Sequence, residues 1–462
     1  MGLQLDELSA INTSERDRIR ELIERERVEL IALSYPENAG ISRVKLVPAS
    51  RLDEILARGV GMSPVFDAFL SDDSVTASPY SGGPVGDLRL FPDLRGAAVL
   101  PTTSGHLWAP AVRYYQDGSP YALCHCGFAL DQERRLASEG YQAAMSFEVE
   151  WTIASDQHAD FQPATRGPAY SLARLAEVAE YVAAVTKALT HAGLNVLQIH
   201  PEYSPGQFEV SVGTTTPTLA ADRLILTKLV VDLVSQEFGY RASFAPVVTL
   251  GGVGNGGHVH FSYLDNGAPL LAGFDLTSSV PSGPTASLVA HLLEGLPALC
   301  AIGSPTVLSY QRLQPQRWAG AFQAWGIENR ECALRYVAPS PLVGTHGANL
   351  EIKSFDLASS PYLIVGAINA IAMHAFRNPL EPPSPLEVDP ASLTPAEREM
   401  RGITPLPGSL PAALDALAGH QVLRDALGEP LYEAFRAVRL AEIERAEGMD
   451  LELLVEVERW KY

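Results

Sequence analysis

The alternating segment at residues 147–153 (FEVEWTI) most constrains the fold, because its aromatic and β-branched residues predict a strand. Glu148 and Glu150 would then lie on the same face of that strand. Two carboxylates side by side repel each other unless water or a cation lies between them. If this pair stood alone, a solvated strand face would explain it. The alternative is a sheet that gathers acidic side chains around a metal ion.

Other strand-like segments carry residues that favour the metal site. The sequence HPEYSPGQFEV places Glu202 and Glu209 on either side of a Pro-Gly turn. His258 and His260 share one face of another predicted strand, and Glu351 lies in the alternating stretch NLEIKSF. A single buried histidine is more often an ordinary core residue. The whole set indicates an oxygen-rich site with some imidazole nitrogen, which suits Mg²⁺ or Mn²⁺ better than zinc.

Basic residues form a second group in the C-terminal half. Arg312 lies in SYQRL, Arg330 in WGIENR and Arg335 in CALRY, while Lys353 follows Glu351 by two residues. Arginines in apolar surroundings bind carboxylate and phosphate oxygens bidentately. The plainer alternative is that they pair with buried glutamates.

Two short motifs invite functional interpretations that their contexts do not favour. Residues 251–257 (GGVGNGG) contain the spacing GxGxxG, but a strand-like segment follows where a dinucleotide-binding motif needs a helix. We therefore expect a flexible loop whose backbone approaches a ligand. In Cys124-His125-Cys126 the single intervening residue is too short for a zinc knuckle, so ordinary buried thiols are expected.

Composition limits the class of protein. The chain has 462 residues, enough for two or three domains, and a formal net charge of −20, which argues against nucleic acid as a partner. Four cysteines are too few for a disulfide framework. The N-terminus does not read as a signal peptide, and no run of ~18 apolar residues is apparent, so we expect a cytoplasmic protein without a membrane partner.

The pattern of elements predicts an α+β fold with two domains. Residues 1–110 are expected to form a small strand-rich domain, and residues 111–462 a larger mixed domain. The Pro-rich segment 379–411 is expected to be a surface loop or flap. We expect helices at residues 14–32 (capped by Ser14), 171–192, 220–236, 361–376 and within 412–460, and strands at 42–48, 88–91, 97–100, 147–153, 208–212 and 258–263.

Five segments, in this order and spacing, resemble glutamine synthetase and its γ-glutamylamine-forming relatives. They are FEVEW, HPEYSPGQFEV, the Gly-rich loop leading into GHVHFS, SYQRL…WGIENRECALRY, and LEIKSFDLASSPYL. The resemblance covers roughly residues 25–460. It implies a β-grasp-like N-terminal domain and a catalytic domain built on a curved antiparallel sheet. It also implies a homo-oligomer, commonly two stacked hexameric rings, in which each site borrows the N-terminal domain of a neighbour.

The resemblance also assigns roles to individual residues. It implies glutamate, ATP and a nitrogen nucleophile as substrates, with two or three Mg²⁺ or Mn²⁺ ions per site. Glu150, Glu202 and Glu209 would hold the metal nearer glutamate, and Glu148, His258 and Glu351 the metal on the nucleotide phosphates. Arg312 and Gly254 would contact glutamate, Arg330, Arg335 and Lys353 the reacting phosphoryl group, and His260, Ser262 and Arg335 the nucleotide.

The chain departs from the family pattern where ammonia would bind. The family places an Asp in the N-terminal domain where this chain has Glu37, and a proton-accepting Glu where an ungapped match gives Trp318. Tyr170 matches the Tyr of the same cage. Tryptophan cannot accept a proton, but it offers apolar and cation–π contact. We therefore expect an organic amine as the nucleophile: an alkylamine, ethanolamine, a polyamine or an aromatic amine.

Three other departures concern the remaining substrates. Lys353 replaces the family's usual Arg, Val253 replaces an Asn that helps to hold glutamate, and the Arg expected near Gly127 is absent. The leading hypothesis is thus an ATP-dependent ligase that phosphorylates the γ-carboxylate of glutamate and forms a γ-glutamyl amide in amine catabolism. The alternatives are a glutamine synthetase that uses ammonia and a non-catalytic, ring-forming relative.

Overall fold

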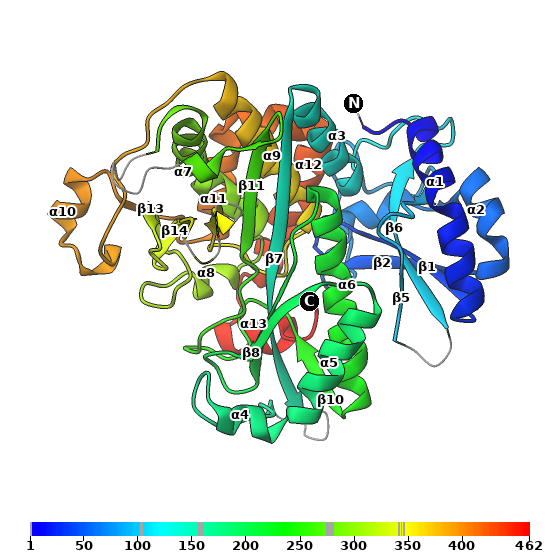
Figure 1. The fold of residues 1–462 in the computed structure, drawn as a ribbon, viewed down its shortest axis with the longest axis horizontal. Coiled ribbons are helices and arrows are strands. Elements are labelled where there is room, and N and C mark those ends of the chain that lie inside the picture. Colours follow the sequence, from blue (N-terminus) through cyan, green and yellow to red (C-terminus); the bar gives the residue numbers. More distant parts are fainter. Residues whose placement is uncertain are drawn as a thin grey trace.

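A computed structural model describes residues 2–101, 105–155, 161–273, 281–340, 342, 344 and 347–462. The N-terminal part, on the right in Figure 1, contains a six-stranded sheet in the order β2-β1-β6-β4-β3, with β5 beside β6. Helices α1 (Leu5–Arg25) and α2 (Leu52–Arg58) pack on it through a separate apolar core. The strands are β1 (Leu30–Pro36), β2 (Ser42–Pro48), β3 (Val60–Met62), β4 (Leu88–Pro92), β5 (Ala98–Val99) and β6 (His106–Tyr114).

The first helix is shifted relative to its prediction. It starts at Leu5, where Gln4 and Glu7 form a capping box, so Ser14 lies inside the helix rather than at its cap. The chain leaves the helix after Arg25, and Arg27 adopts a positive φ of 51°. Residues 30–32 then belong to β1, which pairs with β2 on one side and β6 on the other. The two rows of sheet hydrogen bonds outweigh the helical spacing seen in the sequence.

Asn12 fastens α1 to the sheet, and we expect its removal to destabilise this part of the chain. Its buried side chain donates to the Pro92 carbonyl at 2.7 Å and accepts from the Leu94 N–H at 2.9 Å. Asn12→Ala leaves both backbone groups without these partners, so the free energy of unfolding should fall by about 2 kcal/mol. Urea unfolding measures this. Thr13→Ala, at an exposed neighbouring position, is the control and should change it by under ~0.5 kcal/mol. An equal loss of stability in both variants would contradict the anchoring role of Asn12.

The larger part is built on a ten-stranded sheet in the order β16-β13-β14-β15-β11-β7-β9-β8, with β10 beside β7 and β12 beside β11. The pairing is antiparallel except between β13 and β14, which pair in parallel. The long strand β7 lies at its centre (Figure 1). The strands are β7 (Tyr141–Ser155), β8 (Val196–Pro201), β9 (Gln207–Val212), β10 (Tyr240–Ser243), β11 (Val259–Asp265), β12 (Ala268–Pro269), β13 (Phe322–Ile327), β14 (Cys332–Val337), β15 (Asn349–Ile352) and β16 (Thr404–Pro405).

Helices cover one face of this sheet and leave the other for polar groups. On β7, Phe147, Val149 and Trp151 are buried in the main core together with residues of the helices, so the alternate side chains face away from it. The helices are α3 (His125–Ser138), α4 (Leu172–Glu177), α5 (Ala179–His191), α6 (Pro217–Glu237), α7 (Gly283–Gly303), α8 (Ser309–Arg312), α9 (Pro361–Arg377), α10 (Pro395–Met400), α11 (Leu410–Gly419), α12 (Gln421–Ala446) and α13 (Leu451–Glu458).

Helix α7 was not foreseen from the sequence. It is the one helix among the described residues that is long and apolar enough to cross a membrane, with a mean hydropathy of 1.5 in its most apolar window. Of that window, 83% is buried inside the protein, where α7 packs against α9 and α11. Its apolar composition is thus explained by its place in the core.

Two other predicted elements differ in the structure. The helix expected at residues 171–192 has the predicted Ser171 cap but breaks at Val178 into α4 and α5. The segment 379–411, expected to be a surface loop or flap, contains α10 and is attached to β13: Trp325 Nε1 donates to the Pro383 carbonyl, and Leu386 is buried. The proposed division at residue 110 falls within β6 and stays a prediction.

Candidate active site

The polar face of the large sheet brings together side chains from six strands. In an antiparallel sheet, residues directly opposite each other on one face lie about 5 Å apart at Cβ. His200 is paired with Glu209, Glu209 with Glu150, His260 with Glu351, and Glu351 with Arg335. The Glu148 N–H donates to the His258 carbonyl, which joins β7 to β11. Residues that lie far apart in the sequence thus form one continuous row, from His200 to Arg335.

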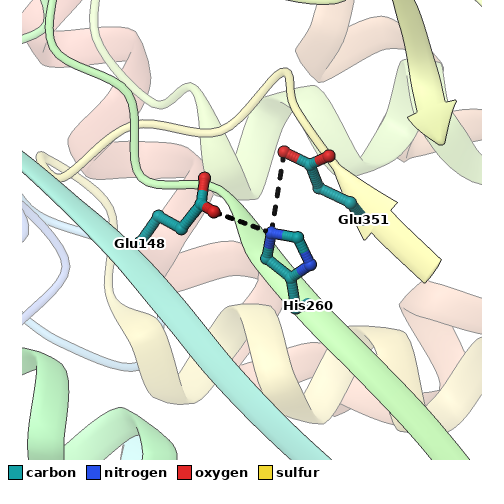
Figure 2. Close-up of side chains that lie close together, drawn as sticks. All are labelled: Glu148, His260 and Glu351. Atoms are coloured by element: carbon teal, nitrogen blue, oxygen red, sulfur yellow. Dashed lines mark ion pairs between the residues drawn. The ribbon is translucent and has the colours of Figure 1, made fainter. Parts of the chain in front are cut away.

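At one end of this row, His260 lies between two carboxylates (Figure 2). Its Nε2 is 3.2 Å from Glu148 Oε1 and 3.7 Å from Glu351 Oε1. His258 reaches the same two groups, with Nδ1 3.0 Å from Glu148 Oε2 and 3.4 Å from Glu351 Oε1. The predicted set of Glu148, His258 and Glu351 therefore converges, and His260 lies close to it.

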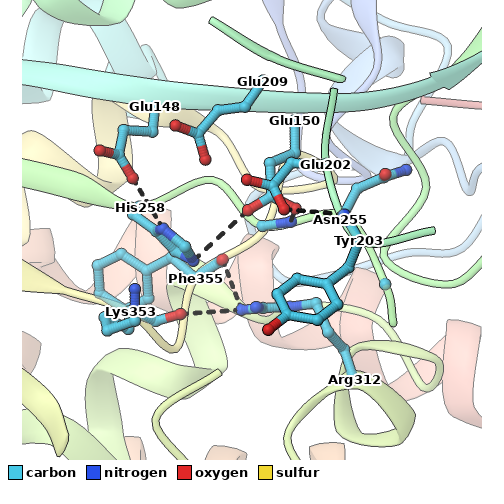
Figure 3. A network of polar contacts seen from close by, with 12 residues as sticks. Glu148, Glu150, Glu202, Tyr203, Glu209, Asn255, His258, Arg312, Lys353 and Phe355 are labelled. Atoms are coloured by element: carbon cyan, nitrogen blue, oxygen red, sulfur yellow. Dashed lines mark hydrogen bonds and ion pairs between the residues drawn. The ribbon is translucent and has the colours of Figure 1, made fainter. Parts of the chain in front are cut away.

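A second group of carboxylates lies toward β8 and β9 (Figure 3). Glu148, Glu209 and His258 form one possible metal-binding trio, and His200, Glu202 and Glu209 form another. Glu150 accepts from Gln207 Nε2 at 2.9 Å and from the Gly256 N–H at 2.8 Å, and it lies 3.9 Å from His258. The predicted ligands Glu150, Glu202 and Glu209 are therefore neighbours.

Burial and mutual repulsion perturb these carboxylates. Burial, followed by the charges of Glu209 and Glu202, raises the pKa of Glu150 to about 8. Burial, with the charge of Glu148 next, raises the pKa of Glu209 to about 7. Without a cation, the folded protein would hold protons here at neutral pH. A divalent ion would remove that repulsion, as expected for a metal site.

The residues present fit hard divalent cations. The donors are carboxylate oxygens with a minority of imidazole nitrogens, and no cysteine belongs to the three trios found among the described residues. His260 Nε2 and His200 Nδ1 are buried and make no hydrogen bond within the described structure. Both face carboxylates, at 3.2 Å for His260 and at 3.5 Å for His200. A metal ion between such groups would bind both the imidazole nitrogen and the carboxylate oxygen.

Three basic side chains lie beside the carboxylates. Arg335 Nη1 is 3.1 Å and Lys353 Nζ 2.9 Å from the buried Glu351 carboxylate. Burial alone would raise the pKa of Glu351, but Lys353 and His260 lower it to about 2. Arg312 is buried and donates to the Lys353 and Phe355 carbonyls (Figure 3), while its Nε makes no hydrogen bond within the described structure. Such a donor is available to an anionic ligand.

A cavity of about 490 Å³ opens over this row of residues. Twelve of the predicted site residues line it: Glu148, Glu150, Tyr170, Glu202, Glu209, Gly254, His258, Arg312, Trp318, Arg330, Arg335 and Lys353. His260 contacts Glu148, Glu351 contacts His258 and His260, and Ser262 lies two residues beyond His260 on β11. The Gly-rich loop leads into β11 rather than a helix, as predicted, and the four cysteines are buried and free.

Glu37 lies apart from the cavity of its own chain. It is fully buried in the N-terminal part and accepts from the Ala39 and Ile41 N–H groups. Burial raises its pKa to about 8. The catalytic role that the resemblance implies for Glu37 stays a prediction.

One end of the cavity has aromatic walls. The Tyr170 hydroxyl donates to the Glu202 carboxylate, and its ring stacks on His200 at 5.2 Å. Tyr203 contacts Tyr170 and Trp318 edge to face, at 5.9 Å and 5.6 Å between ring centroids. The Arg330 guanidinium lies 5.7 Å from the Trp318 ring. This end combines aromatic surface, the Glu202 carboxylate and the Arg330 cation, and the first two suit an alkylammonium group.

Comparisons with known proteins identify the family. Residues 127–455 match the family described as "Glutamine synthetase, catalytic domain", and residues 15–120 match "Glutamine synthetase N-terminal domain". The chain belongs to the glutamine synthetase family. This confirms the predicted fold, and the chain is an ATP-dependent carbon–nitrogen ligase of that family.

Three similar proteins illustrate the range of the family. Over 442 residues, the chain is 42% identical to "Gamma-glutamylpolyamine synthetase GlnA3" of Streptomyces coelicolor, covering 94% of this chain and 93% of that protein. It is 30% identical to "Glutamine synthetase" of Thermotoga maritima, covering 91% and 93%. A solved structure described as a "novel glutamine synthase homolog" superposes with a TM-score of 0.83 at 28% identity, covering 94% and 99%.

Sequence reasoning missed four residues that line the cavity: Gln198, His200, Tyr203 and Arg317. His200 and Tyr203 stand in the segment HPEYSPGQFEV, next to residues that were predicted. The available signal for His200 was its position opposite Glu209 in a two-stranded turn. Arg317, whose Nη2 donates to the Gly251 carbonyl at 3.1 Å, has no signal in the local sequence.

Metal binding should stabilise the protein, and more so at higher pH. The pKa values of Glu150 and Glu209 are raised above the unfolded value of about 4.3. The stability they contribute to the metal-free protein is full below that pH and is lost as pH rises through about 7 to 8. A metal ion competes with the same protons, so the rise in Tm caused by Mn²⁺ over EDTA should increase from about pH 6 to about pH 8.5. Calorimetry measures it, with NaCl of equal ionic strength as control. A rise in Tm that does not depend on pH would contradict the assignment of these carboxylates to a metal site.

Proposed function

We propose that this protein uses ATP to activate the γ-carboxylate of glutamate as an acyl phosphate and transfers the γ-glutamyl group to an organic amine, with a polyamine as the preferred class. A bound ammonium ion first loses one proton to become a nucleophile; as the neutral nitrogen attacks the acyl carbon, phosphate leaves and the nitrogen loses a second proton. The products are a γ-glutamyl amide, ADP and phosphate. The observation that carries the proposal is the position of Trp318 on the cavity wall, where an ammonia-using member of the family would have a carboxylate.

The shape and charge of the aromatic end support this choice. Trp318, Tyr203 and Tyr170 offer aromatic surface to a carbon chain, while the adjacent Glu202 carboxylate attracts an ammonium group. Ammonium itself would gain the charge interaction but none of the apolar contact. The 42% identity to a γ-glutamylpolyamine synthetase over nearly the whole of both chains supports a polyamine among the possible amines.

In this proposal the remaining residues bind different parts of the substrates. Arg312 and Gly254 bind glutamate, and Arg330, Arg335 and Lys353 bind the phosphoryl group as it moves, while His260 and Ser262 lie toward the nucleotide. Two anions must be brought together, so positive charge has to be fixed in place before the reaction. Mg²⁺ or Mn²⁺ held by Glu148, Glu150, Glu202, Glu209, His258 and Glu351 would supply further charge neutralisation. The buried Arg312, with one unpaired N–H, is preorganised for a carboxylate.

The test is phosphate release from ATP with Mg²⁺ and glutamate, together with mass detection of the amide. The panel contains ammonia, methylamine, isopropylamine, ethanolamine, aniline, putrescine and spermidine. We expect a polyamine to give the highest kcat/KM and ammonia little turnover. Turnover with ammonia alone would make the protein a glutamine synthetase and overturn the proposal. Phosphate release without an amide of any tested amine would point to a different nucleophile. No phosphate release at all would point to a non-catalytic relative.

The proposal includes a cytoplasmic assembly of two stacked hexameric rings, in which Glu37 of one subunit completes the site of the next. Its support is that Glu37 is a buried carboxylate with a raised pKa, located away from the cavity of its own chain. Analytical ultracentrifugation of the purified protein gives the number of subunits. A monomer with full activity would exclude a contribution from a neighbour.

A further inference from the structure

The turn that carries Trp318 has an unusual backbone. Gln316 has a φ of 63° and Trp318 a φ of 53°, both in the left-handed region. Residues with a Cβ seldom adopt this conformation, and for a residue as bulky as tryptophan it is an outlier. This conformation is unfavourable for such residues, so the surrounding structure must impose it. The strain occurs in the turn that presents an aromatic side chain to the cavity.

The carboxylate of Glu331 binds both strained residues. Its Oε2 accepts from the Gln316 N–H and its Oε1 from the Trp318 N–H, each at 3.2 Å. One carboxylate therefore holds two alternate amides of the same turn. Glu331 is not among the residues that line the cavity, so it acts on the turn and not on a ligand.

Glu331 is itself fixed from the opposite side. Its N–H donates to Asn329 Oδ1 at 3.1 Å, and Asn329 Nδ2 donates to the carbonyls of Leu386 and Val388 at 2.8 Å and 3.0 Å. Leu386 is buried against β13 and β14 residues. A continuous set of contacts thus runs from the anchored 386–388 segment through Asn329 and Glu331 to Trp318.

We infer that Glu331 is a positioning residue for amine specificity: by binding the Gln316 and Trp318 amides it holds the indole of Trp318 in the wall of the amine end of the cavity. This rests on the proposed function, since the indole is the surface against which the amine packs. When the carboxylate is removed, the turn relaxes toward ordinary φ values and the indole leaves its place. Trp318 is not among the residues assigned to ATP or glutamate, so KM for those substrates should change less than KM for the amine.

The experiment compares Glu331→Ala and Glu331→Gln with the wild type at saturating ATP and glutamate. We expect Glu331→Ala to raise KM for the preferred amine by about tenfold, with KM for ATP changed less than about twofold. Glu331→Gln keeps one acceptor oxygen, so its KM for the amine should lie between those of the wild type and Glu331→Ala. Glu387→Ala, which removes an exposed carboxylate from the same anchored segment, is the matched control and should equal the wild type.

A rescue distinguishes positioning from general damage. Glycine adopts positive φ without steric cost, so Gln316→Gly in the Glu331→Ala background should recover most of the amine affinity. A second readout needs no turnover: acrylamide quenching of Trp318, taken as the difference from the Trp318→Phe protein, should increase in Glu331→Ala. An unchanged amine KM with unchanged quenching would overturn the inference. If the wild type converts no organic amine, the proposed function fails, and the quenching result alone decides the inference.

Discussion

Replacing Glu351 by glutamine is expected to reduce kcat by about 10³-fold while the protein remains folded. The side chain is 1% exposed and lies within 3.7 Å of four groups: His258, His260, Arg335 and Lys353. Glutamine preserves its volume but removes the charge that a metal ion on this side would require. Lys353 and Arg335 would then lack their shared buried partner. Steady-state turnover measures the loss, and circular dichroism and sedimentation check the fold and assembly.

The control for Glu351→Gln is Glu328→Gln, because Glu328 also pairs with Arg335. Glu328 lies 2.5 Å from Arg335 but is 47% exposed, so its pairing with Arg335 contributes little. Glu328→Gln should stay within about threefold of the wild-type kcat and keep the stabilisation by Mn²⁺, which Glu351→Gln should largely lose. Turnover of Glu351→Gln within about tenfold of wild type would mean that this buried group is not part of the reaction.

The strands of the candidate site could be predicted because each carries its own periodic signal. Residues 147–153, 208–212 and 258–263 alternate between apolar and polar side chains, and strands β7, β9 and β11 form there, with β11 beginning at Val259. Alternation fixes which side chains share a face but not which strands are neighbours. The sequence does not show how neighbouring strands are aligned with each other. The position of His200 directly opposite Glu209 could therefore not be predicted.

Features that depend on contacts between distant residues were not predictable. The spacing at residues 14–32 favoured one helix, but pairing of β1 with both β2 and β6 ends it early. Helix α7 is apolar on most of its surface and lacks a clear period, because it is buried on nearly all sides. Glu331 acts on a turn 13 to 15 residues away, so only the folded chain shows that its carboxylate meets Gln316 and Trp318.

Replacing Trp318 by glutamate should change the preferred nucleophile. The indole lines the cavity at 40% exposure and contacts Tyr203. Its loss removes apolar and cation–π contact worth about 2 kcal/mol to an alkylammonium ion, or about 30-fold in kcat/KM. A carboxylate at this position would add a charge-assisted hydrogen bond to ammonium of similar size and a proton acceptor. The ratio of kcat/KM for amine over ammonia should therefore fall by about 10³-fold.

Three variants at position 318 separate the contact made by the indole from proton acceptance by a carboxylate. Trp318→Phe keeps an aromatic ring and should lower amine kcat/KM by less than about tenfold, without gain for ammonia. Trp318→Gln matches glutamate in size but cannot accept the proton as a carboxylate does, so it should lose the amine without gaining ammonia. Only Trp318→Glu should gain ammonia turnover. If all three lose the amine equally and none gains ammonia, the indole supports the turn but does not select the nucleophile. If none loses the amine, the substrate binds elsewhere in the cavity, and the aromatic end has been assigned to the wrong substrate.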